Sequence, residues 1–220
     1  MMEHRRGVIF DLDGVLVDTT GLQFLAWRKT ANALGIDFSE EQNEELKGIS
    51  REDCFHKILS WGNVKLSDED FREYIKVKNQ YYLTYIESMD QSVIFPGVLE
   101  LLGLLEEEEI PFALGSASKS GAIILKKLGL FSKFKAVVDG NDVKNGKPDP
   151  EIFLLAAKKL NCKPSSCMVF EDSLAGIKAA NLAGMWSIGV GNRGLLSVAH
   201  FTFNDLTEVH RRFVMDFPAV

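Results

Sequence analysis

Two carboxylates stand two residues apart directly after a short apolar run. The run covers residues 7–10, and Asp11 and Asp13 follow it in the segment DLDG. A buried strand that ends in acids concentrates negative charge at the edge of a core, and Gly14 permits a sharp turn there. This arrangement suits a nucleophile, Asp11, beside a proton-transfer group, Asp13. A turn capped by aspartates or a calcium loop is the alternative, although residues 15–17 lack the oxygen ligands of an EF-hand.

Two later segments supply groups that phosphoryl transfer requires. The segment GSAS (residues 115–118) offers the Ser116 hydroxyl and backbone N–H groups at the expected start of a helix, which can hold a phosphate. Lys147 is followed by prolines at 148 and 150 and can neutralise both a phosphoryl oxygen and the Asp11 carboxylate. Taken alone, Lys147 would more often be a solvated turn residue.

A further acidic pair follows another apolar run, residues 167–170. Glu171 and Asp172 can complete an oxygen shell for magnesium together with the Asp11 carboxylate and the Asp13 carbonyl. Capping of the next helix by Asp172 or Ser173 is the alternative role, and both roles can hold at once.

The elements that must position these residues are strands alternating with helices. Apolar runs at residues 7–10, 111–115, 135–139, 167–170 and 186–190 predict strands, and helical periodicity separates the later ones. This alternation predicts an α/β fold with a doubly wound parallel sheet, in which ligands bind beyond the carboxyl ends of the strands.

The stretch from residue 20 to residue 92 interrupts that alternation with helical periodicity and no convincing strand. We therefore predict a core domain of residues 1–19 and 93–220 and an inserted all-helical cap of residues 20–92. The hinges are expected near residues 18–20 and 92–96. After Gly194 the pattern weakly favours a loop, a strand and a final helix.

Composition narrows the function classes. The 220 residues are 46% hydrophobic and 25% charged, as in a globular protein, and the net charge of −6 opposes a general nucleic-acid or anionic-membrane binder. No apolar run approaches the roughly 20 residues of a membrane span, and the N-terminus leads into a strand rather than a signal-peptide core. Three cysteines without a C-x-x-C pair indicate neither a disulfide framework nor a zinc site. We expect a cytoplasmic monomer with no nucleic-acid or membrane partner.

The ordered motifs resemble those of the haloacid dehalogenase-like phosphotransferases along the whole chain. The family pattern is D-x-D-G, then a Ser or Thr, then a Lys, then an acidic pair, and here it falls on Asp11/Asp13, Ser116, Lys147 and Glu171/Asp172. The resemblance implies a Rossmann-like core, a Mg²⁺ cofactor held by Asp11, Asp13, Glu171 and Asp172, and an aspartyl-phosphate intermediate. Within the family, the second aspartate argues against dehalogenation.

The cap segment at residues 43–53 is similar to that of the beta-phosphoglucomutase family. This likeness implies interconversion of β-D-glucose 1-phosphate and glucose 6-phosphate through a bisphosphate. Arg51 would grip the distal phosphate, which suits the bidentate geometry of arginine, and Trp27 and Lys78 would line the sugar pocket. The remaining residues expected around the sugar phosphate are Thr19, Gln23, Gly48, Ser50, Asn79, Ser116, Ala117, Ser118, Ser120 and Lys147.

Two departures from that family bear on the reaction. Gln23 stands where those mutases carry a histidine, and Ser120 where they carry an asparagine. The same catalytic pair acting with water would make a Mg²⁺-dependent sugar-phosphate phosphatase or a pyrophosphatase, and Gln23 favours that alternative. A third hypothesis, a non-catalytic binding module, is opposed by intact Asp11, Asp13 and Lys147.

Overall fold

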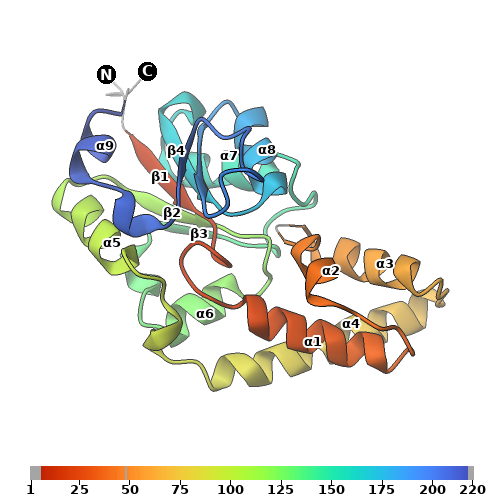
Figure 1. Cartoon of the computed structure of the whole chain (residues 1–220). Coiled ribbons are helices and arrows are strands. Elements are labelled where there is room, and N and C mark those ends of the chain that lie inside the picture. The colour runs from red at the N-terminus through yellow and green to blue at the C-terminus, as the bar shows by residue number, and fades with distance from the viewer. Residues whose placement is uncertain (1–5, 48, 218–220) are drawn as a thin grey trace.

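The computed structural model describes residues 6–47 and 49–217. Its centre is a six-stranded sheet in the order β3-β2-β1-β4-β5-β6, and all neighbouring strands are parallel. The predicted α/β fold with a doubly wound parallel sheet is therefore confirmed (Figure 1). The strands are β1 (Gly7–Phe10), β2 (Phe112–Gly115), β3 (Ala136–Val138), β4 (Cys167–Glu171), β5 (Trp186–Val190) and β6 (Phe201–Phe203).

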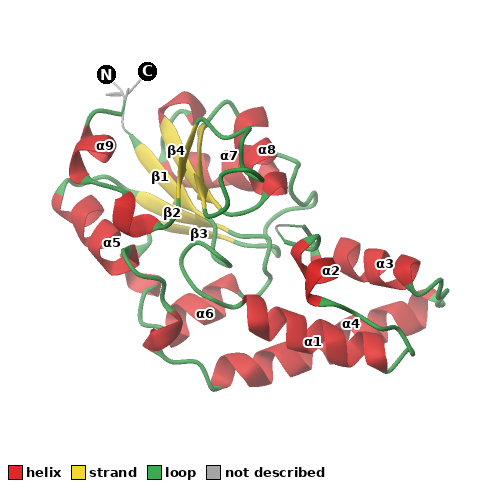
Figure 2. Cartoon of the chain, in the orientation of Figure 1, coloured by secondary structure: helices red, strands yellow, loops and turns green. Residues whose placement is uncertain are grey.

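Helices cover both faces of this sheet (Figure 2). On one face lie α5 (Val98–Glu107), α6 (Gly121–Lys127) and α9 (Arg211–Met215), and on the other lie α7 (Glu151–Leu160) and α8 (Leu174–Leu182). The α5 helix buries Val98, Leu101, Leu102 and Leu105, the i, i+3, i+4, i+7 spacing of one helix face. Short 3₁₀ turns lie at Gln91–Val93, Phe131–Lys133, Pro164–Ser166 and Leu206–Glu208.

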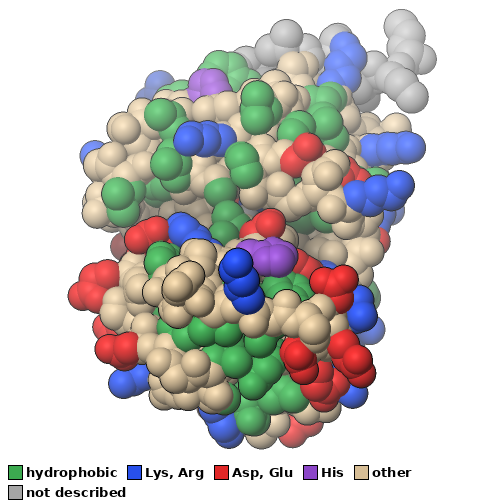
Figure 3. Space-filling view, turned by 90° about the vertical axis from the view of Figure 1, so that its right-hand side faces the viewer, with side chains coloured by type: hydrophobic (Ala, Val, Ile, Leu, Met, Phe, Trp, Pro, Cys, Tyr) green, Lys and Arg blue, Asp and Glu red, His purple; other side chains and the backbone are tan. Residues whose placement is uncertain are grey.

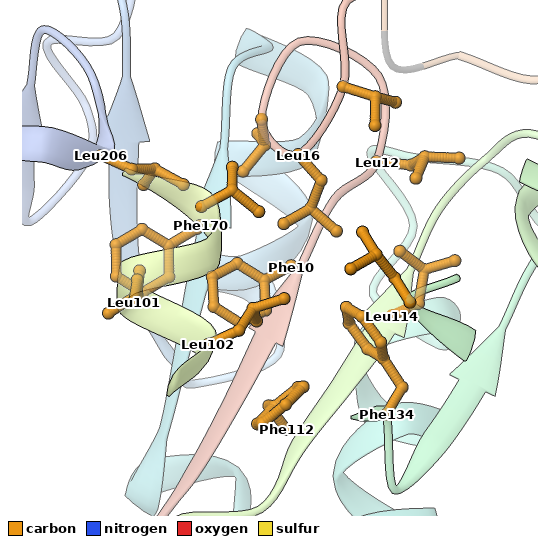
Figure 4. Close-up of a cluster of buried hydrophobic side chains, with 14 of the residues drawn as sticks. Phe10, Leu12, Leu16, Leu101, Leu102, Phe112, Leu114, Phe134, Phe170 and Leu206 are labelled. Atoms are coloured by element: carbon orange, nitrogen blue, oxygen red, sulfur yellow. The ribbon is translucent and has the colours of Figure 1, made fainter. Parts of the chain in front are cut away.

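The core on the α5 face is dominated by aromatic and leucine side chains (Figure 4). Phe10 of β1 stacks on Phe170 of β4 with ring centres 5.2 Å apart, and it meets Phe112 and Phe134 edge-on. Both stacked residues directly precede acids, Asp11 and Glu171. This packing fixes the ends of the two strands from which those acidic side chains project.

Four helices between β1 and α5 form a separate unit beside the carboxyl ends of the strands (Figure 1). They are α1 (Thr20–Asn32), α2 (Glu40–Glu44), α3 (Arg51–Trp61) and α4 (Asp68–Glu87), and we call this unit the cap. The cap has its own buried cluster, in which Trp27 stacks on Phe55 at 5.8 Å. A space-filling view from the cap side shows acidic and basic side chains over both cap and core (Figure 3).

The two connections between cap and core run side by side. The Asp18 N–H donates to the Val93 carbonyl at 2.8 Å, and the Phe95 N–H donates to the Leu16 carbonyl at 3.1 Å. Val17 and Ile94 form an antiparallel bridge between them. The cap therefore leaves and rejoins the core at one place. Among the described residues, no helix combines the length and the apolar character that crossing a membrane requires.

Candidate active site

Three residues from distant parts of the chain meet beyond the carboxyl ends of β1 and β4. The Lys147 ammonium lies 2.5 Å from Asp11 Oδ1 and 2.7 Å from Glu171 Oε2, and all three residues are buried. Burial opposes the lysine charge, but the two carboxylates outweigh it and raise the Lys147 pKa above its usual value. The lysine is therefore a fixed cation between two acids.

Asp172 joins these acids in a cluster that fits a divalent cation. One carboxylate oxygen each from Asp11, Glu171 and Asp172 lies within 4.8 Å of the others. Burial raises the pKa of Asp11 to about 8 against the lowering effect of Lys147. Burial and the neighbouring Glu171 also raise the pKa of Asp172 well above its usual value. Three carboxyl groups lie close together and the buried Lys147 ammonium pairs with two of them, Asp11 and Glu171, so an additional positive charge held by their oxygen atoms would relieve the repulsion.

Local structure holds these acids in place. The Ser173 N–H and hydroxyl donate to Glu171 Oε1 at 2.9 and 2.7 Å, so both oxygens of this carboxylate have partners. Gly14 has φ +86°, and a Cβ atom there would lie 2.1 Å from Asp172 Oδ2. The glycine of DLDG therefore leaves space for the acid as well as allowing the turn.

Asp13 is separate from this acidic cluster and contacts the cap. Thr19 donates its hydroxyl hydrogen to Asp13 Oδ1, and the Tyr82 hydroxyl of α4 lies 3.4 Å from the same oxygen. Burial raises the Asp13 pKa, with the Thr19 hydrogen bond acting in the opposite direction. A carboxyl group with a raised pKa can exchange a proton closer to neutral pH than an exposed one.

A pocket between cap and core has both catalytic candidates in its wall. Of the predicted site residues, the ones lining it are Asp11, Asp13, Gln23, Trp27, Arg51, Lys78, Ala117, Ser118 and Asp172. Lys78 is only 2% exposed, its ammonium lies 4.5 Å from the Trp27 ring centre, and it donates to Gln23 Oε1 at 2.5 Å. Burial, with the nearby Arg51 charge, lowers the Lys78 pKa to about 7.

The other predicted residues that the structure describes are not among those that line this pocket: Thr19, Ser50, Asn79, Ser116, Ser120, Lys147 and Glu171. The Ser50 hydroxyl accepts a hydrogen bond from the Asp53 N–H and caps α3. Ser116 Oγ accepts from the Ser118 N–H at 3.1 Å, and Ser120 is the residue before α6. The buried Asn79 Oδ1 has no hydrogen-bond partner among the described residues. Gly48 lies outside the described residues.

The pocket also contains residues that sequence reasoning missed. Lys47 of the cap reaches within 3.9 Å of Asp172, and Lys119 of the core pairs with Glu52 of α3 at 2.6 Å. Lys47 lies within the cap segment 43–53 and Lys119 directly follows the segment GSAS, so a positive charge at these places was the available signal. Further missed lining residues are Thr20, Asn43, Leu46, Ile49 and Cys54.

Comparison with known proteins gives a consistent result. The model of the haloacid dehalogenase-like hydrolases matches residues 6–184. The chain is similar to a beta-phosphoglucomutase of Bacillus subtilis, with 41% identity over 188 residues covering 84% of this chain and 83% of that one. A phosphorylated carbohydrates phosphatase of Thermotoga maritima is 35% identical over 180 residues, 81% of each chain. The crystal structure of a beta-phosphoglucomutase from Clostridium difficile has a TM-score of 0.93 and 40% identity, and the match covers 96% of each chain.

Proposed function

The chain belongs to the haloacid dehalogenase-like hydrolase family and is an enzyme of phosphoryl transfer, and on that premise we propose that it is a beta-phosphoglucomutase-type isomerase. Its substrates would be β-D-glucose 1-phosphate and glucose 6-phosphate. One observation carries the proposal: a single pocket is lined by Asp11 and Asp13 and also by the cations Arg51 and Lys119. A mutase must hold a second phosphate while the first reacts, and the two cations supply that grip.

The proposed cycle begins with the phosphate carried on Asp11. Asp13 removes the proton of the sugar 6-hydroxyl, whose oxygen attacks phosphorus, and the bond from phosphorus to the Asp11 oxygen breaks. The bisphosphate then turns round in the pocket. Asp11 attacks the phosphate on carbon 1, and Asp13 returns its proton to the departing sugar oxygen.

The groups around Asp11 lower the barrier by holding charge. Lys147, 2.5 Å from Asp11 Oδ1, is placed to neutralise the oxygens of the transferring group. Mg²⁺ bound by Asp11, Glu171 and Asp172, with the Asp13 carbonyl, would supply further charge neutralisation there.

We also propose that residues 20–92 act as a mobile cap that turns on the paired connections at residues 16–18 and 93–95. The Lys119–Glu52 and Lys47–Asp172 contacts join cap and core across the pocket. Closure of the cap would exclude water and align the sugar hydroxyl with the phosphate. Cys54 and Cys167 carry reduced thiols, which fits a reducing compartment, and we propose a cytoplasmic monomer.

The test is the fate of the phosphate. The purified protein receives β-glucose 1-phosphate, a catalytic amount of glucose 1,6-bisphosphate and Mg²⁺, and glucose 6-phosphate and inorganic phosphate are measured together. Glucose 6-phosphate should predominate. Predominant phosphate release would reject the mutase proposal in favour of a sugar-phosphate phosphatase, the activity named for the relative from Thermotoga maritima.

Two variants connect the result with the proposed nucleophile. Asp11→Asn keeps the size of the side chain but removes the nucleophilic carboxylate, so turnover should fall by about a thousandfold or more. Asp37→Asn makes the same chemical change at an exposed position in the cap and should leave turnover unchanged. Equal turnover in the two variants would contradict the role of Asp11.

A further inference from the structure

Lys119 lies at the boundary between the candidate pocket and a second hollow between cap and core. Among the described residues, the pocket that holds Asp11 and Asp13 is lined by Lys119 but not by Glu52. The second hollow is lined by both Lys119 and Glu52. The Lys119 ammonium lies 2.6 Å from Glu52 Oε1. The cation that is proposed to grip the distal phosphate therefore already has an acidic partner, and this partner comes from the cap.

This ion pair is partly exposed, and that distinguishes it from the pairs of Lys147. The side chains of Lys119 and Glu52 are 33% and 43% exposed, whereas the Lys147 side chain has no exposed surface. Breaking a buried pair leaves charges that water cannot reach, but breaking an exposed pair costs little because water solvates both groups. Lys119 can therefore change partners during a reaction, and Lys147 cannot.

Local structure holds the backbone at Lys119 and leaves the Glu52 side chain free to pair. The Asn141 side-chain amide donates to the Lys119 carbonyl oxygen at 2.9 Å. At the start of α3 it is Asp53, not Glu52, that hydrogen-bonds to the Ser50 hydroxyl. Burial opposes ionisation of Glu52, but the Lys119 hydrogen bond outweighs it and the pKa of Glu52 is lowered. Glu52 is therefore a charged group that the helix start does not require.

We propose that Glu52 competes with the distal phosphate of the substrate for Lys119 and takes up the ammonium group each time that phosphate leaves. On binding, the phosphate dianion displaces the carboxylate from Lys119. On release, the carboxylate returns, so the cation is never left without a partner. A mutase must loosen its grip on the distal phosphate in every cycle, because the bisphosphate turns round before the second transfer. The proposal rests on the proposed function, in which Arg51 and Lys119 hold that phosphate.

A simpler role for the pair, holding the cap against the core, predicts an effect of the opposite sign. If Glu52 serves only to close the cap, Glu52→Gln makes the closed form less stable, and a ligand enclosed by that form binds more weakly. If Glu52 competes for Lys119, the same change leaves the ammonium to the phosphate and removes a repelling charge. Binding then becomes tighter. The direction of the change therefore separates the two roles.

The experiment measures the binding of glucose 1,6-bisphosphate in the presence of Mg²⁺. Every protein carries Asp11→Asn, so that turnover does not consume the ligand. Calorimetry gives the dissociation constant, and stopped-flow tryptophan fluorescence gives the dissociation rate. Glu52→Gln should tighten binding about three- to tenfold through slower dissociation. Lys119→Met should weaken binding, and Glu52→Gln added to Lys119→Met should have little further effect, because the contested cation is gone.

Glu106→Gln is the matched control. Glu106 of α5 pairs with Lys133 at 2.8 Å, and the side chains of this pair are 43% and 38% exposed, much like those of Glu52 and Lys119. The control removes the same charge and a similar ion pair at a distance from the pocket, so it should leave bisphosphate binding unchanged. Unchanged or weaker binding by Glu52→Gln would overturn the proposal. Equal tightening by Glu106→Gln, or by Glu52→Gln without Lys119, would overturn it as well.

The binding experiment and the activity assay can fail independently. If the wild type releases inorganic phosphate from β-glucose 1-phosphate, the mutase proposal falls. Tightening by Glu52→Gln that requires Lys119 would still uphold the competition between carboxylate and phosphate. Conversely, production of glucose 6-phosphate by a protein whose bisphosphate affinity does not respond to Glu52→Gln would uphold the mutase and reject the role of Glu52.

Discussion

Replacement of Lys147 by methionine should destabilise the protein by an amount that grows with pH. In the folded protein the Lys147 ammonium contacts Asp11 and Glu171 at 2.5 and 2.7 Å with no exposed side-chain surface. It also lies 4.7 Å from the centre of the Phe153 ring, so a methionine side chain can pack there without leaving a large cavity. The main effect of the substitution is therefore electrostatic.

The magnitude follows from the two carboxylates that lose their partner. Breaking a buried ion pair by removing one member costs about 3–5 kcal/mol, and we expect that cost at pH 8.5. Asp11 already has a folded-state pKa raised to about 8 from 3.8, and losing Lys147 raises it further. An acid whose folded pKa is raised binds more protons in the folded state, so stability increases as pH falls. At pH 5.5 the cost should decrease to about 1–2 kcal/mol, the value of lost hydrogen bonds.

The assay is urea unfolding of both proteins at the two pH values, in a chelator that removes divalent cations. Lys144→Met, an exposed lysine in the same loop, is the matched control and should change stability by less than about 0.5 kcal/mol. A cost below about 1 kcal/mol at pH 8.5 would refute the reasoning. So would a cost that is as large at pH 5.5 as at pH 8.5.

Three further predictions follow from the same site. Lys78, whose pKa burial lowers to about 7, binds fewer protons in the folded than in the unfolded state above that pH. Lys78 should therefore raise the free energy of unfolding by up to about 1.4 kcal/mol per pH unit from pH 7 toward pH 10. In urea unfolding, Lys78→Met should abolish this rise with pH, whereas Lys76→Met, at an exposed position of the same helix, should retain it. Mg²⁺ at a hundred times its dissociation constant should add about 2.7 kcal/mol to the unfolding free energy of the wild type and so raise its melting temperature. An equal rise in the melting temperature of Asp172→Asn would contradict the metal assignment. Gly14→Ala should lower the free energy of unfolding by more than about 2 kcal/mol, because the added Cβ would clash with the Asp172 carboxylate. Gly35 also has a positive φ, +71°, but has open space around it, so Gly35→Ala should lower that free energy by only about 1 kcal/mol. Equal losses of the two variants in urea unfolding would exclude the steric argument.

The inner strands β1, β2, β4 and β5 were predictable because each is a short apolar run that a parallel sheet buries on both faces. Residues 7–10 and 186–190 coincide with β1 and β5, and the run at 167–170 misses only Glu171 of β4. The order of the strands was not predictable, since alternation of strands and helices fixes parallel pairing but not which strands become neighbours. The strand expected after Gly194 is β6, only three residues long, which explains its weak pattern.

The candidate site was predictable where local sequence determines it and unpredictable where tertiary contacts do. Asp11, Asp172 and Lys147 belong to short motifs at strand ends, and the fold brings them together. Tyr82 contacts Asp13 from a position 69 residues further along the chain, and nothing around Tyr82 distinguishes it from other helical aromatics. Its position depends on how α4 packs against α1, which periodicity alone does not specify.

The central position of β1 has a consequence for synthesis of the chain. β1 is flanked by β2 on one side and β4 on the other, so its backbone cannot be fully paired until the residues of β4 have left the ribosome. Bringing such distant segments together pays the entropy of closing long loops. Until the segments that carry Lys147, Glu171 and Asp172 have been synthesised, Asp11, the proposed phosphate acceptor, therefore lacks the side chains that surround it in the folded protein.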